Sequence, residues 1–241
     1  MNDLHLENAR WAPAQLGRAW DQAWGAFMLA PGLWLRSGLV YLGIVFAPAL
    51  VYVFAWIFHG AVAGRYALDD LLYLLPSFAF RVNLAVFVVF RILNVCSVIA
   101  VILWSVIIYR NAARVAAGKR LTWRDFFTCF DIVRGCVVGF LCLVCVAIGV
   151  KMFIIPGVVV FCCCYFAPMA VFSMAQPTVV GAFAASIRML KANPAATLLV
   201  IAVSYALSAV GGIFTVAMVL TLPLGVLLGT FAFRNSVVGA R

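Results

Sequence analysis

The sequence predicts an all-α polytopic membrane protein, in which six transmembrane helices are accompanied by short interfacial amphipathic helices. Of its 241 residues, 67% are hydrophobic and 10% are charged, whereas soluble domains average about 45–50% and about 25%. The apolar residues also gather in runs of the length that a transmembrane helix needs, about 20 residues. The basic residues gather on one side of these runs. These observations exclude a soluble protein and predict one integral membrane domain, residues 1–241.

The excess of 17 Lys+Arg over 7 Asp+Glu would suggest nucleic acid as the partner of a soluble protein. In a membrane protein, basic residues instead collect in cytoplasmic loops and beside anionic headgroups. We therefore expect no nucleic-acid partner. The segment 1–10 is polar and lacks the apolar centre of a cleavable signal peptide, so the first span is expected to act as the insertion signal.

An amphipathic segment, 13–30, precedes the first span. Its apolar side chains recur at three- and four-residue steps, namely Leu16, Trp20, Trp24 and Phe27. Its polar side chains lie opposite them, namely Gln15, Arg18, Asp21 and Gln22. This pattern predicts a helix in the headgroup layer, followed by a first span at 37–58. The proline-containing stretch 71–80 is too short to cross and is expected to be interfacial or re-entrant.

The second span is predicted at 92–109, directly after Arg91, the one charge that falls near the hydrocarbon. Arg91 is therefore an intramembrane polar candidate that pairs with Asp69 or Asp70. Alternatively, it lies at the interface with its guanidinium among the headgroups. We favour the interface because the uncharged residues of 92–109 already suffice to cross.

The loop after this span is the most basic part of the chain, and we predict that it binds lipid or a partner. Thr122 and Asp125 have the spacing of a capping box. An aromatic stripe is expected to continue the resulting helix into the third span, namely Trp123, Phe126, Phe127, Phe130 and Val133. A later amphipathic segment, 179–191, adds two further basic residues. The predicted lipid- or partner-binding residues are Arg110, Arg114, Lys119, Arg120, Trp123, Arg124, Phe127, Arg188 and Lys191.

Four further spans are predicted at 135–150, 152–174, 195–210 and 213–233. Lys151 separates the first two of these, which must form a tight hairpin. The 39 uncharged residues of 195–233 would make a straight helix of about 58 Å, nearly twice the hydrocarbon thickness. A turn is therefore required, and Gly211 and Gly212 are its predicted site.

Each pair of spans follows an amphipathic segment, so we interpret the domain as three units of interfacial helix plus hairpin. Three similar hydropathy blocks without duplication would give the same pattern. Six spans place 13 Lys+Arg on the side of both termini and four on the opposite side. Those four are Arg65, Arg81, Arg91 and Lys151. Both termini are therefore predicted to be cytoplasmic.

No set of residues suited to catalysis is visible in the sequence. The predicted spans contain no Asp or Glu, and no acid–base pair or nucleophile with a histidine can be assigned. Cys142 and Cys145 form a C-x-x-C pair, and thiolates are ligands for Cu(I). Consecutive cysteines 162–164, however, point about 100° apart on a helix, so we interpret the cysteines as small packing residues. No catalytic residue, cofactor or metal is predicted.

Pro156, Pro168 and Pro223 place helix breakers inside spans. Proline has no N–H for the carbonyl four residues earlier, so Pro168 would free the carbonyl of Cys164 and Pro223 that of Val219. Freed carbonyls line cavities in transporters with broken helices. A simple kink also explains each proline, and we favour the kink.

Two parts of the chain carry a family resemblance. One part contains Ile-Ile-Pro-Gly at 154–157, Tyr-Phe-Ala-Pro at 165–168, Lys-Ala-Asn-Pro at 191–194 and Leu-Pro at 222–223. The other contains Ala-Pro-Gly-Leu-Trp at 30–34 after Trp20, Trp24 and Phe27. Together, over 16–34 and 135–234, they resemble the bacterial six-helix inner-membrane proteins related to the membrane domain of glycerophosphoryl diester phosphodiesterases. The resemblance implies a six-helix fold and an inner-membrane location. We find no hydrolytic domain and expect no hydrolytic activity.

We therefore expect a non-enzymatic, multi-pass protein of the bacterial inner membrane. It would be an accessory or membrane-organising subunit that binds lipids and partners, either other membrane subunits or a cytoplasmic protein. The alternative is a permease-like subunit that transports a hydrophobic or lipidic substrate with a cytoplasmic partner. A membrane-embedded metal or redox protein is the third hypothesis.

Overall fold

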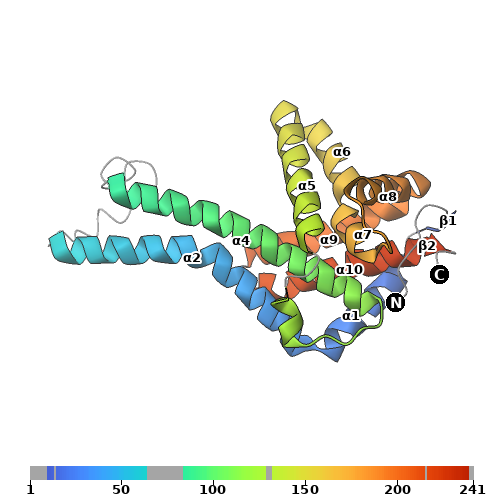
Figure 1. Ribbon diagram of the computed structural model, residues 1–241, viewed down its shortest axis with the longest axis horizontal. Coiled ribbons are helices and arrows are strands. Elements are labelled where there is room, and N and C mark those ends of the chain that lie inside the picture. Colours follow the sequence, from blue (N-terminus) through green and yellow to red (C-terminus); the bar gives the residue numbers. More distant parts are fainter. Residues whose placement is uncertain (1–9, 14, 64–83, 129–131, 215, 239–241) are drawn as a thin grey trace. The chain divides into compact units, whose positions relative to one another are not determined.

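The structure is a computed structural model that describes residues 10–13, 15–63, 84–128, 132–214 and 216–238. Contacts divide the chain into two compact units, Met1–Val40 with Ile102–Arg241, and Tyr41–Val101. Two helices, α2 (Pro31–Ala63) and α4 (Leu84–Ala116), contribute to both units. Figure 1 shows the ribbon, coloured along the sequence from blue at the N-terminus to red at the C-terminus. The predicted segment 71–80, together with Asp69 and Asp70, lies outside the described residues.

Within the described residues, six helical stretches are long and apolar enough to cross a membrane, and each overlaps one predicted span. They are Pro31–Phe54, Val88–Ala116, Ile132–Lys151, Ile154–Ser173, Pro194–Ile213 and Met218–Ser236. In the first five stretches most residues are not buried inside the protein, as expected where lipid replaces water, whereas Met218–Ser236 is mostly buried. The predicted fold class, an all-α polytopic membrane protein, is confirmed.

The first amphipathic helix, α1 (Leu16–Leu29), forms within the predicted segment 13–30, and the face that it buries in the protein shares only Phe27 with the predicted apolar stripe. Its buried side chains are Ala19, Ala23, Ala26 and Phe27, and this face packs against helix α10 (Met218–Ser236). Trp24, which belongs to the apolar stripe predicted to face the headgroup layer, is 40% exposed and stacks on Trp20 and Phe27. Small alanines allow the two helix backbones to approach closely.

Helix α4 continues beyond Arg110, where the sequence predicted its end, to Ala116. It is terminated by Gly118, whose φ of +78° is open to glycine at little cost. The N–H of Lys119 donates to the carbonyl of Arg114 at 3.0 Å, and the N–H of Gly118 donates to that of Val115 at 2.8 Å. These two bonds are the Schellman motif that ends many helices. Arg110 and Arg114 therefore lie on the helix and not in the loop.

The predicted helix after Thr122 is a single 3-10 turn, η2 (Trp123–Phe126). The capping box between Thr122 and Asp125 is present, as predicted. The aromatic stripe does not run on into the next span, because the turn ends at Phe127 and helix α5 (Ile132–Met152) starts anew. Phe126 is fully buried whereas Phe127 is 59% exposed, so neighbouring aromatic side chains have opposite environments.

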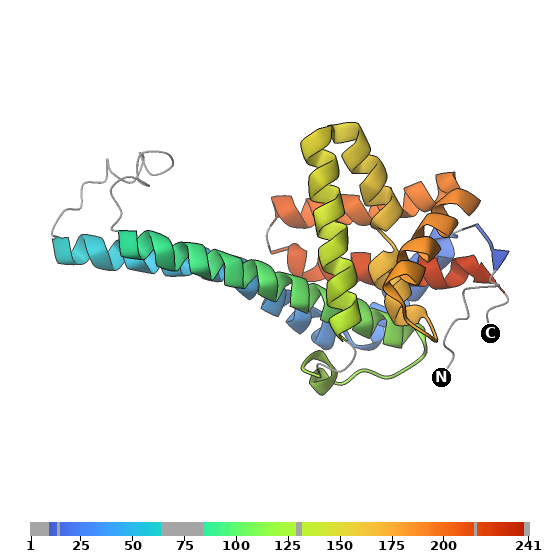
Figure 2. The ribbon, with the colours of Figure 1, turned by 45° about the horizontal axis from the view of Figure 1, so that its top comes forward.

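The hairpin predicted at Lys151 joins α5 to α6 (Ile154–Cys164), and the two helices lie side by side (Figure 2). A Cβ atom at Gly149 would lie 2.9 Å from the Cα of Gly157, which is closer than real Cβ atoms approach. Two facing glycines thus allow the tight packing of this hairpin. Pro156 lies in the first turn of α6, where proline is tolerated.

The fourth span is broken near Pro168, so the simple kink that we had favoured there is wrong. Helix α6 ends at Cys164, and a separate helix, α7 (Ala167–Ser173), begins with the proline in its first turn. The thiol of Cys142 lies 3.7 Å from the Cys164 carbonyl oxygen, the group that Pro168 was predicted to free. The backbone N–H of Phe166 donates to Ser186 Oγ at 3.2 Å. Side chains from two other helices therefore satisfy the break. Pro223, in contrast, lies inside the continuous helix α10.

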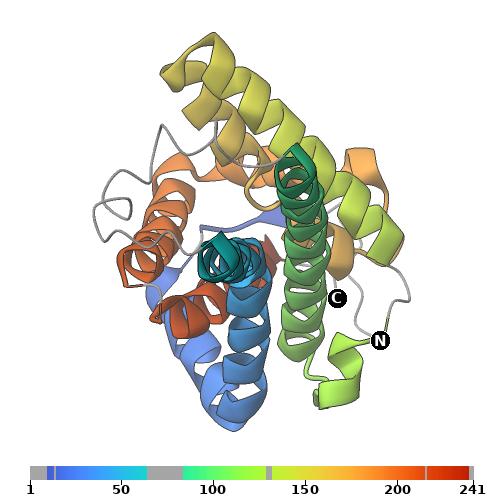
Figure 3. The ribbon, with the colours of Figure 1, turned by 90° about the vertical axis from the view of Figure 1, so that its left-hand side faces the viewer.

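The last three helices are α8 (Val179–Ala192), α9 (Pro194–Ile213) and α10. Figure 3 shows α10 between α1 and α9, in agreement with its contacts. The turn between α9 and α10 lies after Ile213, not at Gly211 and Gly212 as predicted. Gly211 is inside α9, where an added Cβ would collide with Thr221 of α10. This glycine serves the close contact of two helices rather than a backbone turn.

The chain ends are joined by a short antiparallel pair of strands, β1 (Arg10–Trp11) and β2 (Val237–Val238). The N–H of Ala12 extends the pairing by donating to the Ser236 carbonyl at 2.8 Å. Asn235 Nδ2 donates to Gln22 Oε1 at 2.7 Å, which links α10 to α1. Two ends that are more than two hundred residues apart in the sequence are therefore adjacent in the first unit.

Helices α1 and α8 correspond to each other position by position. Each has 14 residues, ends in a residue with φ of −149° and is followed by a helix that starts at a proline, Pro31 or Pro194. Three buried positions coincide at an offset of 163, pairing Ala19 with Ala182, Ala23 with Ser186 and Ala26 with Met189. The interpretation of α1 and α8 as repeated elements thus has detailed structural support. In the second unit of the predicted repeat, η2 takes the place of such a helix.

The three interfacial elements, α1, η2 and α8, pack in the same way: each contacts the last span of the preceding unit, and the first unit follows the third. The element α8 packs against α7, the end of the hairpin before it, and α1 packs against α10, the last helix of the chain. The element η2 packs against the end of α4 through Phe126 and Trp104. Each interfacial element therefore covers the last span of the preceding unit.

The second compact unit, Tyr41–Val101, consists of described parts of α2 and α4. Ser97 Oγ donates to the Ile44 carbonyl at 2.7 Å, and the Tyr52 and Phe90 rings lie 5.1 Å apart. These contacts join its two helical segments, whose side chains are otherwise mainly exposed.

Candidate functional site

The predicted basic loop folds around a buried arginine. Arg110 is 7% exposed, and its guanidinium donates to the carbonyls of Asp125 and Thr128 and, at 3.0 Å, to Thr128 Oγ1. A charged donor to backbone oxygens makes stronger hydrogen bonds than a neutral one. Arg110 therefore fixes the loop from the inside, and it does not belong to the surface on which we predicted lipid binding.

Asp125 fixes the loop from the outside. Its carboxylate accepts from the Thr122 N–H at 2.7 Å, the Thr122 hydroxyl at 2.8 Å and Arg114 at 2.8 Å. These contacts, the Thr122 backbone N–H first among them, hold the pKa of Asp125 below its ordinary value of 3.8. The ion pair is partly exposed, so its own contribution is expected to be at most about 1 kcal/mol. The capping bonds are the more important restraint.

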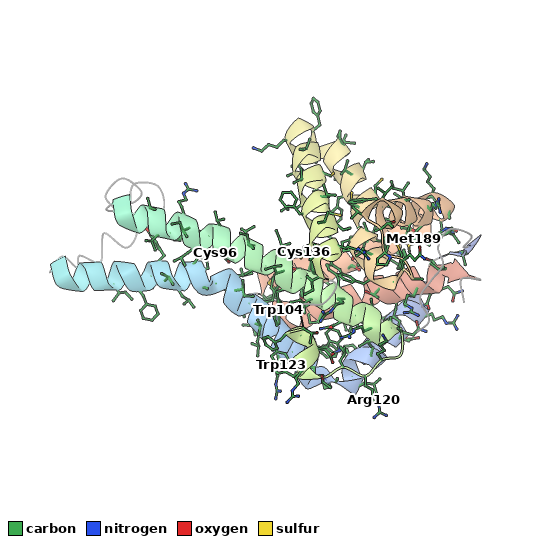
Figure 4. The ribbon with its side chains drawn as sticks, viewed as in Figure 1. Cys96, Trp104, Arg120, Trp123, Cys136 and Met189 are labelled. Atoms are coloured by element: carbon green, nitrogen blue, oxygen red, sulfur yellow. The ribbon has the colours of Figure 1, made fainter. Side chains whose placement is uncertain are left out.

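Aromatic rings make up the layer beneath this loop. Phe126 lies 5.4 Å from Trp123, 6.0 Å from Trp34 and 6.1 Å from Trp104, measured between ring centroids. Figure 4 shows Trp104 on α4 and Trp123 on η2, with Arg120 on the loop that connects them. The Trp104 indole N–H donates to the Ser37 carbonyl at 2.9 Å. The layer thus connects the start of α2, the end of α4 and η2.

The loop between α4 and α5 exposes basic side chains together with one aromatic ring. Lys119, Arg120 and Arg124 are exposed. Phe127 is 59% exposed and packs edge-on against Trp123 at 5.3 Å. Cations beside an exposed aromatic ring are the combination that favours a headgroup layer, because one attracts phosphate and the other enters the apolar boundary.

Two buried donors in the same layer were not predicted from the sequence. Trp34 Nε1 and Asn111 Nδ2 have no hydrogen-bond partner within the described part of the chain, and both residues are 0% exposed. A buried donor without an acceptor costs about 1–3 kcal/mol. The position of Asn111, an amide beside Arg110 in the last turns of α4, was a signal that the sequence offered.

The remaining predicted residues lie elsewhere. Arg188 and Lys191 are exposed on α8, which packs against α7, α6 and α9. Arg91 is exposed in the first turn of the span Val88–Ala116, within the second compact unit. None of the three belongs to the loop between α4 and α5 or to η2. The predicted binding residues therefore fall into separate groups.

The cysteines do not assemble a metal centre in the described part of the chain, where no group of three or more His, Cys, Asp or Glu side chains is placed to hold an ion. The seven cysteines among the residues that the structure describes are free thiols, and Cys129 lies outside those residues. Cys142 contributes its thiol to the break in the fourth span. Its role there is structural.

Comparison of the chain with family models, curated proteins and solved structures gives no match. The fold itself defines the class: the chain is an all-α, multi-pass membrane protein.

Proposed function

We propose that this chain is a non-enzymatic accessory or membrane-organising subunit that binds anionic phospholipid through the loop between α4 and α5. The observation that carries the proposal is the fixed presentation of Lys119, Arg120 and Arg124 beside exposed Phe127. A loop that served only to set topology would need the charges but not the bonds that order them. Here Arg110 and Asp125 hold the backbone in one conformation.

The location and orientation belong to the same proposal. We propose a bacterial inner-membrane protein with both termini in the cytoplasm. The pairing of β1 with β2 supports placing the termini on one side, and the distribution of Lys+Arg supports the cytoplasmic side. The family resemblance supports the inner membrane, and it stays a prediction.

Charge reversal on the loop tests the function. Each basic residue near an anionic surface contributes about 1 kcal/mol, so Lys119→Glu with Arg120→Glu is expected to weaken phosphatidylglycerol binding by about 30-fold or more. The matched control, Lys119→Arg with Arg120→Lys, exchanges the side chains and keeps both charges. Retained lipid is counted by native mass spectrometry of the purified protein. Equal lipid retention by the charge-reversed protein and the control would show that the loop only sets topology.

The alternative, a permease-like subunit for a lipidic substrate, has one observation in its favour. The fourth span is broken between Cys164 and Ala167, and Ser186 of α8 contacts the break. Broken spans lie at the substrate sites of many transporters. Movement of a fluorescent phospholipid between leaflets of proteoliposomes, abolished by Ser186→Ala, would favour this function over the first.

A further inference from the structure

Trp34 and Asn111 lie beneath the same short helix. Trp34 contacts η2 through the ring of Phe126, 6.0 Å away. Asn111 is connected to η2 through Arg110, which approaches the Asn111 Oδ1 at 3.5 Å and donates to the Asp125 carbonyl. Both donors therefore belong to one layer of the first compact unit.

Helix geometry directs Asn111 toward α2. It follows Trp104 by seven residues, which is close to two full turns, so the two residues share one face of α4. The Trp104 indole on that face donates to the Ser37 carbonyl of α2. Trp34 lies one turn before Ser37 on α2, and the Ser37 hydroxyl donates to its carbonyl. The two donors are thus on the facing sides of α2 and α4.

We propose that Trp34 Nε1 and Asn111 Nδ2, next to the Arg110 guanidinium, form a binding site for a phosphate group. The phosphate comes from the headgroup of an anionic phospholipid or from inorganic phosphate. If the phosphate belongs to a lipid, this inference rests on the proposed function. The site then adds a buried contact for the headgroup to the contacts made by the exposed basic side chains.

The chemistry of the layer selects an anionic acceptor. The two N–H groups without a partner in the described residues are donors, and the adjacent guanidinium is positively charged. A water molecule could accept from both donors, but unlike phosphate it carries no negative charge to complement the guanidinium of Arg110, which donates to the neutral carbonyls of Asp125 and Thr128. Phosphate oxygens carry negative charge and accept from several donors at once.

The position of the site predicts how its ligand behaves. Both donors are covered, so the phosphate enters and leaves only when η2 opens. Salt screens a buried ion much less than an exposed one. Phosphatidylglycerol at this site is therefore expected to survive salt that removes lipid from Lys119 and Arg120.

The test uses the full-length protein in mild detergent with added phosphatidylglycerol. Native mass spectrometry after a wash in about 0.5 M NaCl is expected to find a single retained lipid on the unmodified protein. The variant Trp34→Phe with Asn111→Leu removes both donors while keeping an aromatic ring at position 34 and a side chain of similar size at position 111, and it is expected to lose the salt-resistant lipid. The charge-reversed Lys119→Glu, Arg120→Glu protein is expected to keep it and to lose only the salt-sensitive lipid.

A second measurement separates the two sources of phosphate and reports folding. Thermal unfolding without lipid is compared in sodium phosphate and in sodium chloride of equal ionic strength. A higher Tm in phosphate for the unmodified protein alone would identify inorganic phosphate as the ligand. In chloride, the double variant is expected to unfold no earlier than the unmodified protein, because the removal of two unsatisfied buried donors offsets the packing lost with the smaller ring.

Two results would overturn the inference. One is an unmodified protein with neither a salt-resistant lipid nor a Tm raised by phosphate. The other is a double variant that retains lipid and responds to phosphate as the unmodified protein does. Failure of the proposed function is recognised separately, since it appears as unchanged salt-sensitive lipid on the charge-reversed protein.

Discussion

Replacing Phe126 with alanine should open the loop between α4 and α5. The side chain is fully buried and its ring meets three tryptophans at centroid distances of 5.4 to 6.1 Å. Loss of a buried phenylalanine costs about 3–5 kcal/mol. The loop lies outside the membrane-spanning segments, so this value, measured in water-soluble proteins, applies to it.

Hydrogen exchange measures the effect where it arises. The N–H of Asp125 donates to the Thr122 carbonyl at 3.1 Å, and that of Phe127 donates to the Arg124 carbonyl at 3.0 Å. If these amides exchange through local opening, a loss of about 3 kcal/mol accelerates exchange by about 100-fold. Mass spectrometry of the peptide that covers residues 122–127, with the protein in detergent, gives the rate.

The adjacent residue provides the control. Phe127 has the same side chain but is 59% exposed, so Phe127→Ala is expected to change the exchange rate by less than about threefold, as surface substitutions usually do. Comparable acceleration in the two variants would refute the assignment of Phe126 as the residue that anchors the loop.

Three further predictions concern the contact between α9 and α10, the titration of Asp125 and the topology. Gly211→Val should lower the Tm in detergent, because the added side chain overpacks the contact with α10 at a cost of about 1–3 kcal/mol. Gly212→Val should not lower the Tm, because the space around its Cβ is open. Equal Tm values for the two variants would contradict this packing. Because the folded-state pKa of Asp125 is lowered, its contribution to loop stability is complete above about pH 4 and is lost as the pH falls through that lower pKa. Tryptophan fluorescence should follow this loss, and Asp125→Asn should remove the pH dependence. Reporter fusions after Arg120 and Arg241 should both report cytoplasm, and a periplasmic signal from either would exclude the six-span orientation.

The sequence predicts the spans well because membrane insertion depends on local hydropathy, which needs no knowledge of neighbours. Helix ends were harder to place. Arg110 was taken as the end of a span because it is charged, yet its charge is satisfied by carbonyls of a segment 15 to 18 residues away. Gly118 was the better signal, since it follows the last helical turn and allows the positive φ of a helix end.

Packing partners could not be predicted from periodicity. The pattern of α1 identified a stripe that includes its tryptophans as the apolar face, but it gave no sign that the alanines would pack against α10. Similarly, two consecutive glycines, Gly211 and Gly212, are typical of a turn. Only the approach of Thr221 shows that Gly211 lies where α9 contacts α10. The donors at Trp34 and Asn111 are close to one layer only because α2, α4 and η2 meet there, which is a tertiary property.

The packing of α1 against α10 has a consequence for biosynthesis. The ribosome completes α1 at Leu29, but its partner α10 begins only at Met218. At a synthesis rate of about 5–20 residues per second, roughly 10–40 s pass between the synthesis of α1 and that of α10. The alanine face of α1 has no α10 to pack against during this time. During that interval the nascent chain must shelter α1 at the membrane surface or on an insertion factor. Deletion of α10 should therefore leave α1 accessible to protease in a chain whose earlier spans have already been inserted.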